Sequence, residues 1–98
     1  MANVQEVRNS IIAEATKKHE KYPQYAGHWD GFKLVRVKKN IRTKMGIAFV
    51  KGEVSIAQDA TKNLLPKYAE EVAGCVSVYS KRNSIDTLID AKNIEWLE

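Results

Sequence analysis

The stretch MGIAFVKGEVSIA, residues 45–57, decides the fold that this sequence predicts. Its two halves, residues 45–50 and 53–57, have the composition and alternation of β-strands. Lys51-Gly52 separates them and places Gly at the second central position of a turn, which suits a type II turn better than the primed turns of flat hairpins. We therefore expect two strands that fold back on each other and splay apart from this turn.

A helix is predicted before these strands, over residues 4–21. Asn3 and Glu6 have the spacing of an N-cap and its capping-box partner, and Tyr22-Pro23 provides a stop. Apolar residues recur at helical spacing, at Val4, Val7, Ile11 and Ala15. This pattern predicts an amphipathic helix.

The remaining strands are expected at residues 32–39, 75–79, 85–89 and 93–97. Residues 40–44 are polar around Ile41 and predict a loop. Residues 58–74 predict a longer loop, with a turn or two of helix around 67–73 and with Leu64, Leu65 and Tyr68 holding it to the strands. By alternation, Val76 and Val78 point inward and Tyr79 outward.

Residues 32–35 and 45–50 are apolar on both sides of their strands. In the second segment Met45, Ile47 and Phe49 share one face, and Ala48 and Val50 share the other. Both faces of such strands need a cover, so the helix is expected to pack against the sheet or to cap an open barrel end. The aromatic connector, residues 22–30, is expected to fill the seam between helix and sheet in preference to forming a stacking platform for bases.

Two motifs resemble Src-homology-type (SH3-like) small β-barrels. IAFVKGEVSI, residues 47–56, is similar to their diverging turn, in which apolar-x-Phe-x-Lys-Gly-acidic-x-apolar follows a long polar loop. IDAKNI, residues 89–94, leading into Glu95-Trp96-Leu97, is similar to the short helical turn and closing strand that end those barrels. The resemblance covers residues 32–97. It implies a mainly β (α+β) fold in which an N-terminal helix precedes a five-stranded SH3-like small barrel.

The sequence departs from that family where the family binds proline-rich peptides. The family's first strand is rich in tyrosine, but residues 32–39 contain none. Cys75-Val76 occupies the position of its tryptophan pair, and Asp90 and Asn93 stand where its Pro and Tyr would be. The resemblance therefore implies the fold but not polyproline binding.

Length and composition predict one globular domain, residues 1–98, because 44% of the residues are apolar and 29% are charged. The longest uninterrupted apolar run, residues 47–50, is far shorter than the roughly 20 residues of a spanning helix, and the N-terminus lacks a signal-peptide core. We expect a soluble, cytoplasmic protein with no membrane partner. Cys75 is the only cysteine and is interpreted as a small buried hydrophobe, and no metal or other cofactor is expected.

No catalytic motif is recognised. His19 and His28 have no Cys, Ser, Asp or Glu at a spacing typical of a dyad, and both are interpreted as structural or exposed. Asp86 and Asp90 share a strand face but have little room for a pocket between them. The sequence also lacks a glycine-rich phosphate loop and a nucleophile elbow, so the prediction is that the protein is not an enzyme.

Basic residues are concentrated in one segment. Residues 1–31 carry four basic and four acidic side chains, residues 52–98 carry five and eight, and residues 32–51 carry seven basic and none acidic. These seven are Lys33, Arg36, Lys38, Lys39, Arg42, Lys44 and Lys51. Because they belong to one strand and the loop after it, we expect them to form a single positive surface, with Tyr79 and Arg82 adding a stacking surface.

This surface favours two kinds of partner. The first prediction is a small non-catalytic module that binds DNA or RNA through Lys33–Lys51. The alternative is a protein-interaction or self-associating module, in which the same face docks an acidic protein or the apolar helix face docks a second copy. Lysines on a strand edge also prevent edge-to-edge association, so a role in solubility alone remains a third interpretation.

Overall fold

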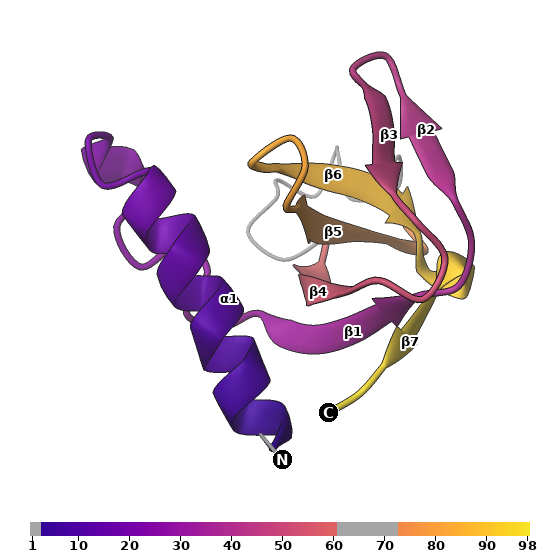
Figure 1. The fold of residues 1–98 in the computed structure, drawn as a ribbon, viewed down its shortest axis with the longest axis horizontal. Coiled ribbons are helices and arrows are strands. Elements are labelled where there is room, and N and C mark those ends of the chain that lie inside the picture. The colour runs from indigo at the N-terminus through magenta and orange to yellow at the C-terminus, as the bar shows by residue number, and fades with distance from the viewer. Residues whose placement is uncertain (1–2, 61–72) are drawn as a thin grey trace.

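The computed structural model describes residues 3–60 and 73–98 (Figure 1). Helix α1 (Val4–Lys18) comes first, followed by a 3₁₀ turn, Pro23–Tyr25. The strands are β1 (Lys33–Val37), β2 (Ile41–Thr43), β3 (Gly46–Phe49), β4 (Val54–Asp59), β5 (Cys75–Ser80), β6 (Ile85–Asp90) and β7 (Ile94–Trp96). A second 3₁₀ turn, Ala91–Asn93, joins β6 to β7. The fold is mainly β with an N-terminal helix, as predicted.

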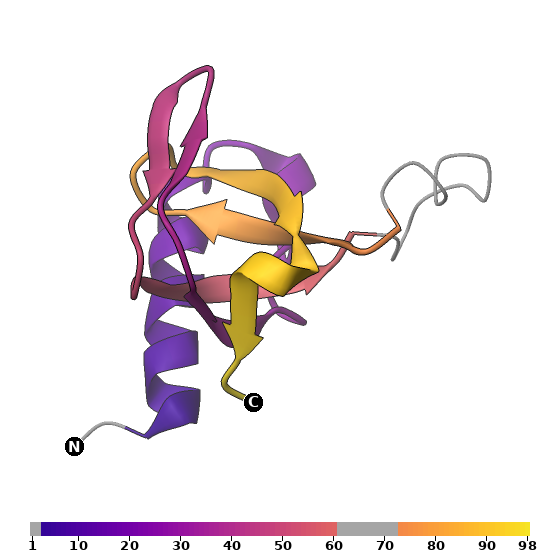
Figure 2. The same cartoon turned by 90° about the vertical axis from the view of Figure 1, so that its right-hand side faces the viewer.

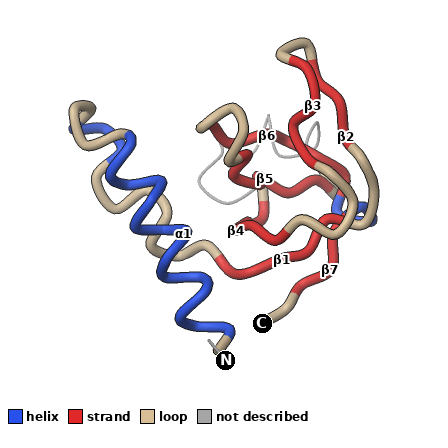
Figure 3. Tube along the Cα trace, in the orientation of Figure 1, coloured by secondary structure: helices blue, strands red, loops and turns tan. Residues whose placement is uncertain are grey.

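Five of these strands form one antiparallel sheet in the order β6-β5-β4-β1-β7 (Figure 3). Strand β1 pairs with β4 on one side, where Leu34 lies opposite Ile56, and with β7 on the other. Strand β5 pairs with β4 and β6. The strands expected at residues 32–39, 75–79, 85–89 and 93–97 are thus all present within a few residues of their predicted bounds.

The predicted pairing across Lys51-Gly52 is wrong. Strand β3 pairs with β2 in a separate two-stranded sheet, whereas β4 pairs with β1 and β5. The turn itself agrees with the prediction, because Glu53 N–H donates to the Val50 carbonyl at 3.0 Å and Gly52 has φ +90°. A turn of this kind splays the chain, so the strands on its two sides find different partners.

The polar loop predicted at residues 40–44 is also wrong, because these residues include β2. Ile41 and Thr43 are β-branched and fit a pleated strand. Ile41 lies opposite Phe49 and packs against the core, while a bulge follows it in the register. The hairpin β2–β3 therefore has a buried root and an exposed tip.

Two apolar cores lie on opposite faces of the five-stranded sheet. One consists of strand residues only, namely Val35, Val37, Ala48, Phe49, Ala57, Val76, Val78, Ile89 and Ile94. The other lies between the sheet and α1 and contains Ile11, Ala15, Trp29, Phe32, Leu34, Ile56 and Tyr79. The helix thus packs against the sheet, and Trp29 fills the seam, as the sequence predicted. Tyr22 of the same connector is 52% exposed.

Both ends of α1 are defined by hydrogen bonds. Asn3 Oδ1 accepts from Glu6 N–H at 2.8 Å, which confirms the predicted N-cap. The helix ends at Lys18, three residues before the predicted end, because the last turn tightens: His19 N–H donates to the Thr16 carbonyl at 3.2 Å and Glu20 N–H donates to the Lys17 carbonyl at 3.4 Å. Arg8 pairs with Glu98, whose other carboxylate oxygen accepts from Leu34 N–H at 2.7 Å. Glu98 therefore ties the helix to β1.

The loop predicted at residues 58–74 begins two residues too early, because Gln58 and Asp59 belong to β4. The helical turn expected around residues 67–73 and the contacts of Leu64, Leu65 and Tyr68 fall on residues 61–72, outside the described residues. Cys75, the first residue of β5, is half-buried, so its predicted full burial is not observed.

Candidate nucleic-acid interface

The hairpin β2–β3 and its root carry most of the predicted basic residues. The hairpin projects away from the five-stranded sheet, on the side of the molecule away from α1 (Figure 1, Figure 2). Its five cations are Lys38, Lys39, Arg42, Lys44 and Lys51. We call residues 38–51 the basic arm.

The tip of the basic arm is a tight turn with Lys44 and Met45 at its centre. Thr43 lies opposite Gly46 across the hairpin, and the Thr43 hydroxyl accepts from Met45 N–H at 3.1 Å. Gly46 has φ +101°, a conformation that L side chains rarely adopt. This turn places Lys44 and Met45 at the end of the hairpin, beyond its last paired residues.

The root of the arm is held by hydrogen bonds that backbone N–H groups donate. Lys51 N–H donates to Asn40 Oδ1 at 2.8 Å, and Lys38 N–H donates to the Asn93 carbonyl at 2.8 Å. Gly52 N–H donates to the Val37 carbonyl at 2.8 Å. These bonds bring the backbones of residues 38–40 and 51–52 side by side, so three lysines meet at the root with exposed side chains.

The five cations of the arm are exposed, and none of them forms an ion pair with another described residue. The segment 32–51 contributes no carboxylate that would neutralise them. Their positive charge is therefore exposed to solvent and attracts anions over about 8 to 10 Å at moderate salt.

Arg36 and Arg82, also predicted for the site, differ from the arm because each has a carboxylate partner. Arg36 Nη1 lies 3.2 Å from Glu95 Oε1, and Arg82 Nη2 lies 3.5 Å from Glu53 Oε1. Both arginine side chains are about half exposed, so these pairs are weak and exchangeable. Glu53 also accepts from Val50 N–H at 3.0 Å, which places Arg82 beside the Lys51-Gly52 turn.

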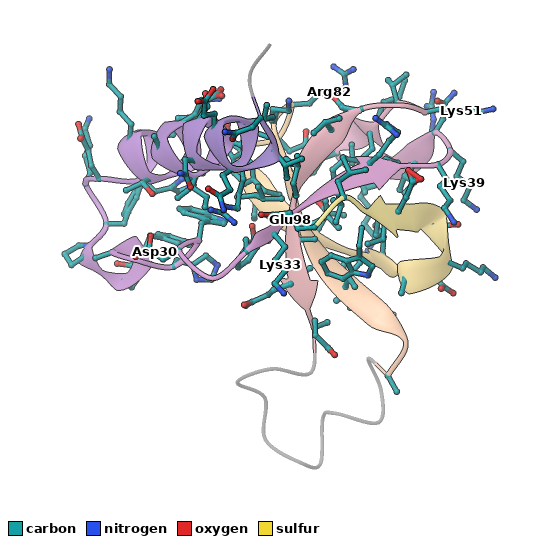
Figure 4. All side chains as sticks on the ribbon, turned by 90° about the horizontal axis from the view of Figure 1, so that it is seen from below. Asp30, Lys33, Lys39, Lys51, Arg82 and Glu98 are labelled. Carbon is teal, nitrogen blue, oxygen red and sulfur yellow. The ribbon has the colours of Figure 1, made fainter. Side chains whose placement is uncertain are left out.

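Lys33 does not share the surface of the arm. It begins β1 opposite Ala57, whereas the arm follows the other end of that strand. Figure 4 shows Lys33 well separated from Lys39 and Lys51, which lie near each other. The expectation of one continuous positive surface across Lys33–Lys51 is therefore wrong at its first residue.

The expected outward orientation of Tyr79 is wrong. Its side chain is fully buried, and its ring packs edge-to-face on Trp29 with centroids 5.5 Å apart. Alternation itself holds, because Tyr79 lies on the face opposite Val76 and Val78, but α1 and the connector cover that face. Burial raises the pKa of the Tyr79 hydroxyl above its ordinary value, and the nearby Ser84 side chain partly opposes that rise. Tyr79 cannot stack on a base.

Exposed apolar side chains on the arm are a feature that the sequence did not predict. Met45, Ile47 and Phe49 were expected to share a covered face, but Met45 is 66% and Ile47 44% exposed, and only Phe49 is buried. The reason is that the arm leaves the sheet after its root. The tip therefore carries both cations, Arg42 and Lys44, and exposed apolar side chains, Met45 and Ile47.

A histidine–carboxylate pair is a second feature that the sequence did not predict. His28 Nε2 lies 2.7 Å from Asp86 Oδ2, and Trp29 Nε1 donates to Asp86 Oδ1 at 2.8 Å. The partners are 58 and 57 residues apart in the chain, so no local motif marks them. Within residues 3–60 and 73–98, His28 has no hydroxyl or thiol hydrogen-bond partner, so the pair lacks the nucleophile of a catalytic triad.

The described residues contain no group of three or more His, Cys, Asp or Glu side chains placed to hold a metal ion. In the same part of the chain, no helix has the length and apolar character needed to cross a membrane. Comparison with family models, curated proteins and solved structures finds no match to this chain.

Proposed function

We propose that this protein is a small non-catalytic module that binds DNA or RNA through the basic arm. The observation that carries the proposal is a set of five exposed cations that form no ion pair with the described part of the chain and lie on a projecting hairpin without a carboxylate of its own. Phosphate backbones present negative charge at close, regular intervals, and exposed lysine and arginine side chains bind them by releasing counterions.

The shape of the arm supports this proposal. A two-stranded ribbon fits into the major groove of B-form DNA. Exposed cations along such a ribbon can also contact the phosphate backbone of a single strand. Met45 and Ile47 add apolar surface at the tip, which suits contact with sugars and base edges. Arg36 and Arg82 lie outside the arm, and they become available to bind phosphate if their weak ion pairs with Glu95 and Glu53 open.

We also propose that the strands form an SH3-like small barrel that serves as the platform for the arm. Three observations support it: the strand order β6-β5-β4-β1-β7, the hairpin that precedes the splayed turn at Lys51-Gly52, and the 3₁₀ turn Ala91–Asn93 before the last strand. In this proposal the basic arm takes the place of the long polar loop of those barrels. Polyproline binding is not proposed.

The test is a fluorescence-anisotropy titration of labelled single- and double-stranded DNA and RNA at about 50 and about 200 mM salt. The arm variant carries Lys39→Glu, Arg42→Glu and Lys44→Glu. The matched control carries Lys17→Glu, Lys21→Glu and Lys33→Glu, three exposed cations outside the arm. Both variants change the net charge equally.

The proposal expects the wild-type protein and the control to bind at low salt, and the arm variant to bind at least about tenfold more weakly than the control. Equal losses in the two variants would show that only net charge matters and would refute the arm as the binding surface. The absence of binding by the wild-type protein at low salt would refute nucleic-acid binding altogether.

A second candidate, an interaction with an acidic protein or with another copy of this chain, is favoured by the apolar side chains of the same arm. Met45, Ile47 and Val50 are exposed there, and the hairpin forms no ladder with any other strand of the described residues. Sedimentation equilibrium across a range of protein concentrations tests self-association. A dimer that is lost on changing Met45→Ser and Ile47→Ser would support this candidate, and a monomer at all concentrations would refute the self-associating form.

A further inference from the structure

A small cavity lies between the end of α1 and the 3₁₀ turn Pro23–Tyr25, away from the basic arm. Its volume is about 200 Å³. Its walls come mainly from His19, Tyr22, Pro23 and Tyr25, with Glu20 at one side. The cavity is therefore lined mainly by aromatic residues, with one acidic residue among them.

The two tyrosine rings form a corner. Their centroids are 6.3 Å apart and their planes meet at 79°. A cation seated about 4.5 Å above each of two perpendicular rings would require centroids about 6.4 Å apart, within the range in which ring faces attract cations. The ring of His19 closes a third side, 4.8 Å from Tyr25 and 6.5 Å from Tyr22.

The walls of this corner are fixed by contacts within the protein. Tyr25 stacks on Trp29 with centroids 5.6 Å apart and planes only 6° from parallel. His19 Nδ1 lies 2.9 Å from the Ala15 carbonyl, and its ring also contacts Trp29. Tyr22 N–H and Tyr25 N–H donate to the carbonyls of His19 and Tyr22, both at 3.0 Å. A ligand would therefore enter a cavity that is already formed and lose little free energy to ordering its walls.

Glu20 is the one acidic residue among those that line the cavity. Its side chain is exposed and forms no ion pair with any other described residue. The neighbouring lysines, Lys17 and Lys21, do not line the cavity. A carboxylate beside aromatic rings favours a cation whose hydration is weak, because a strongly hydrated primary ammonium loses more on leaving water.

We propose that this aromatic corner binds a trimethylammonium group, carried either by a small molecule such as choline or by a methylated lysine side chain. Both sources present the same compact, weakly hydrated cation. The site is separate from the basic arm, so this proposal does not depend on nucleic-acid binding.

The test is an NMR titration of the full chain that follows the ring protons of Tyr22 and Tyr25. The probes are choline, its neutral isostere in which tert-butyl replaces trimethylammonium, and an N-acetyl trimethyl-lysine amide. The proposal expects saturable shifts with choline and with the lysine amide, and at least about tenfold weaker binding of the neutral isostere. Tighter binding of the lysine amide would assign the natural ligand to a protein side chain, and tighter binding of choline would assign it to a small molecule or headgroup.

Three variants test separately the contributions of the Tyr22 ring, the Tyr22 hydroxyl and the Glu20 carboxylate to binding. Tyr22 is half exposed, so Tyr22→Leu leaves the core intact, and Tyr22→Phe is its matched control. We expect Tyr22→Leu to weaken choline binding at least tenfold, Tyr22→Phe to preserve it, and Glu20→Gln to weaken it several-fold. Equal binding of choline and the neutral isostere would overturn the proposal. So would unchanged binding by Tyr22→Leu, or the absence of saturable shifts with either cation.

Discussion

Trp29 and Asp86 are 57 residues apart in the chain but are joined by a hydrogen bond of 2.8 Å from the indole Nε1 to the carboxylate Oδ1. The second oxygen of the same carboxylate lies 2.7 Å from His28 Nε2. Asp86 therefore ties the connector after α1 to strand β6. It also satisfies the only polar group of a tryptophan that is otherwise fully packed in the helix-side core.

Removal of this carboxylate is expected to destabilise the protein. Asp86→Ala leaves the buried Trp29 N–H without a partner, so we expect the free energy of unfolding to fall by about 1.5 to 3 kcal/mol. Asp86→Asn retains an acceptor oxygen and should cost less than the alanine variant. Urea denaturation of the three proteins measures both changes, and an alanine variant within about 0.5 kcal/mol of the wild-type protein would contradict the structural role.

Gly52 tests the turn that separates the two sheets. A Cβ built at this position meets no atom within 4 Å, so the cost of Gly52→Ala comes from its φ of +90° alone. We expect a loss of about 1 to 3 kcal/mol in the free energy of unfolding. Lys51→Ala in the same turn has no such constraint and should change stability by less than about 0.5 kcal/mol. Equal effects of the two variants would mean that the turn does not require a positive φ.

Tyr79 is expected to make the protein sensitive to alkali. Its pKa is raised mainly by burial, so above about pH 10 the unfolded chain ionises this phenol while the folded protein keeps it neutral. The contribution of neutral Tyr79 to the free energy of unfolding is therefore fully present below about pH 10, and it is lost progressively as the pH rises through the folded-state pKa. Tyr79→Phe removes this contribution, and its free energy of unfolding should decline less steeply between about pH 8 and about pH 11.

The same variant should be well tolerated near neutral pH. The Tyr79 hydroxyl is buried and has no hydrogen-bond partner among residues 3–60 and 73–98, so its removal should change the free energy of unfolding by no more than about 1 kcal/mol at pH 8. Urea denaturation of the wild-type protein and of Tyr79→Phe at about pH 8 and about pH 11 measures how far the free energy of unfolding of each declines. An alkaline decline as steep in Tyr79→Phe as in the wild-type protein would show that other groups cause it.

The fold could be predicted from the sequence wherever local chemistry determines the structure. Asn3 and Glu6 marked the start of α1, and Gly52 marked a turn that splays the chain. Strand partners depend on residues far apart in the chain, and this is where prediction failed. The segment containing β2 is too polar to be recognised as a strand, so β3 was assigned to β4, the nearest apolar neighbour.

The candidate site was also predicted only in part, because its charges follow from local sequence but their neighbours do not. A run of cations without carboxylates is visible in the sequence, and the hairpin keeps five of the seven together. The ion pairs of Arg36 and Arg82, and the separation of Lys33, depend on which strands are neighbours. The burial of Tyr79 depends on the helix that covers its face, which strand alternation does not reveal.

The most direct test of the central claim is the salt dependence of nucleic-acid binding. The logarithm of the binding constant falls linearly with the logarithm of salt concentration, with a slope of about −0.9 for each duplex phosphate that is neutralised. The variant Arg42→Ala, Lys44→Ala should reduce the magnitude of this slope by about 2 relative to the wild-type protein. The control Lys17→Ala, Lys21→Ala should leave it unchanged, and a wild-type slope in the arm variant would contradict the assignment of the basic arm as the nucleic-acid interface.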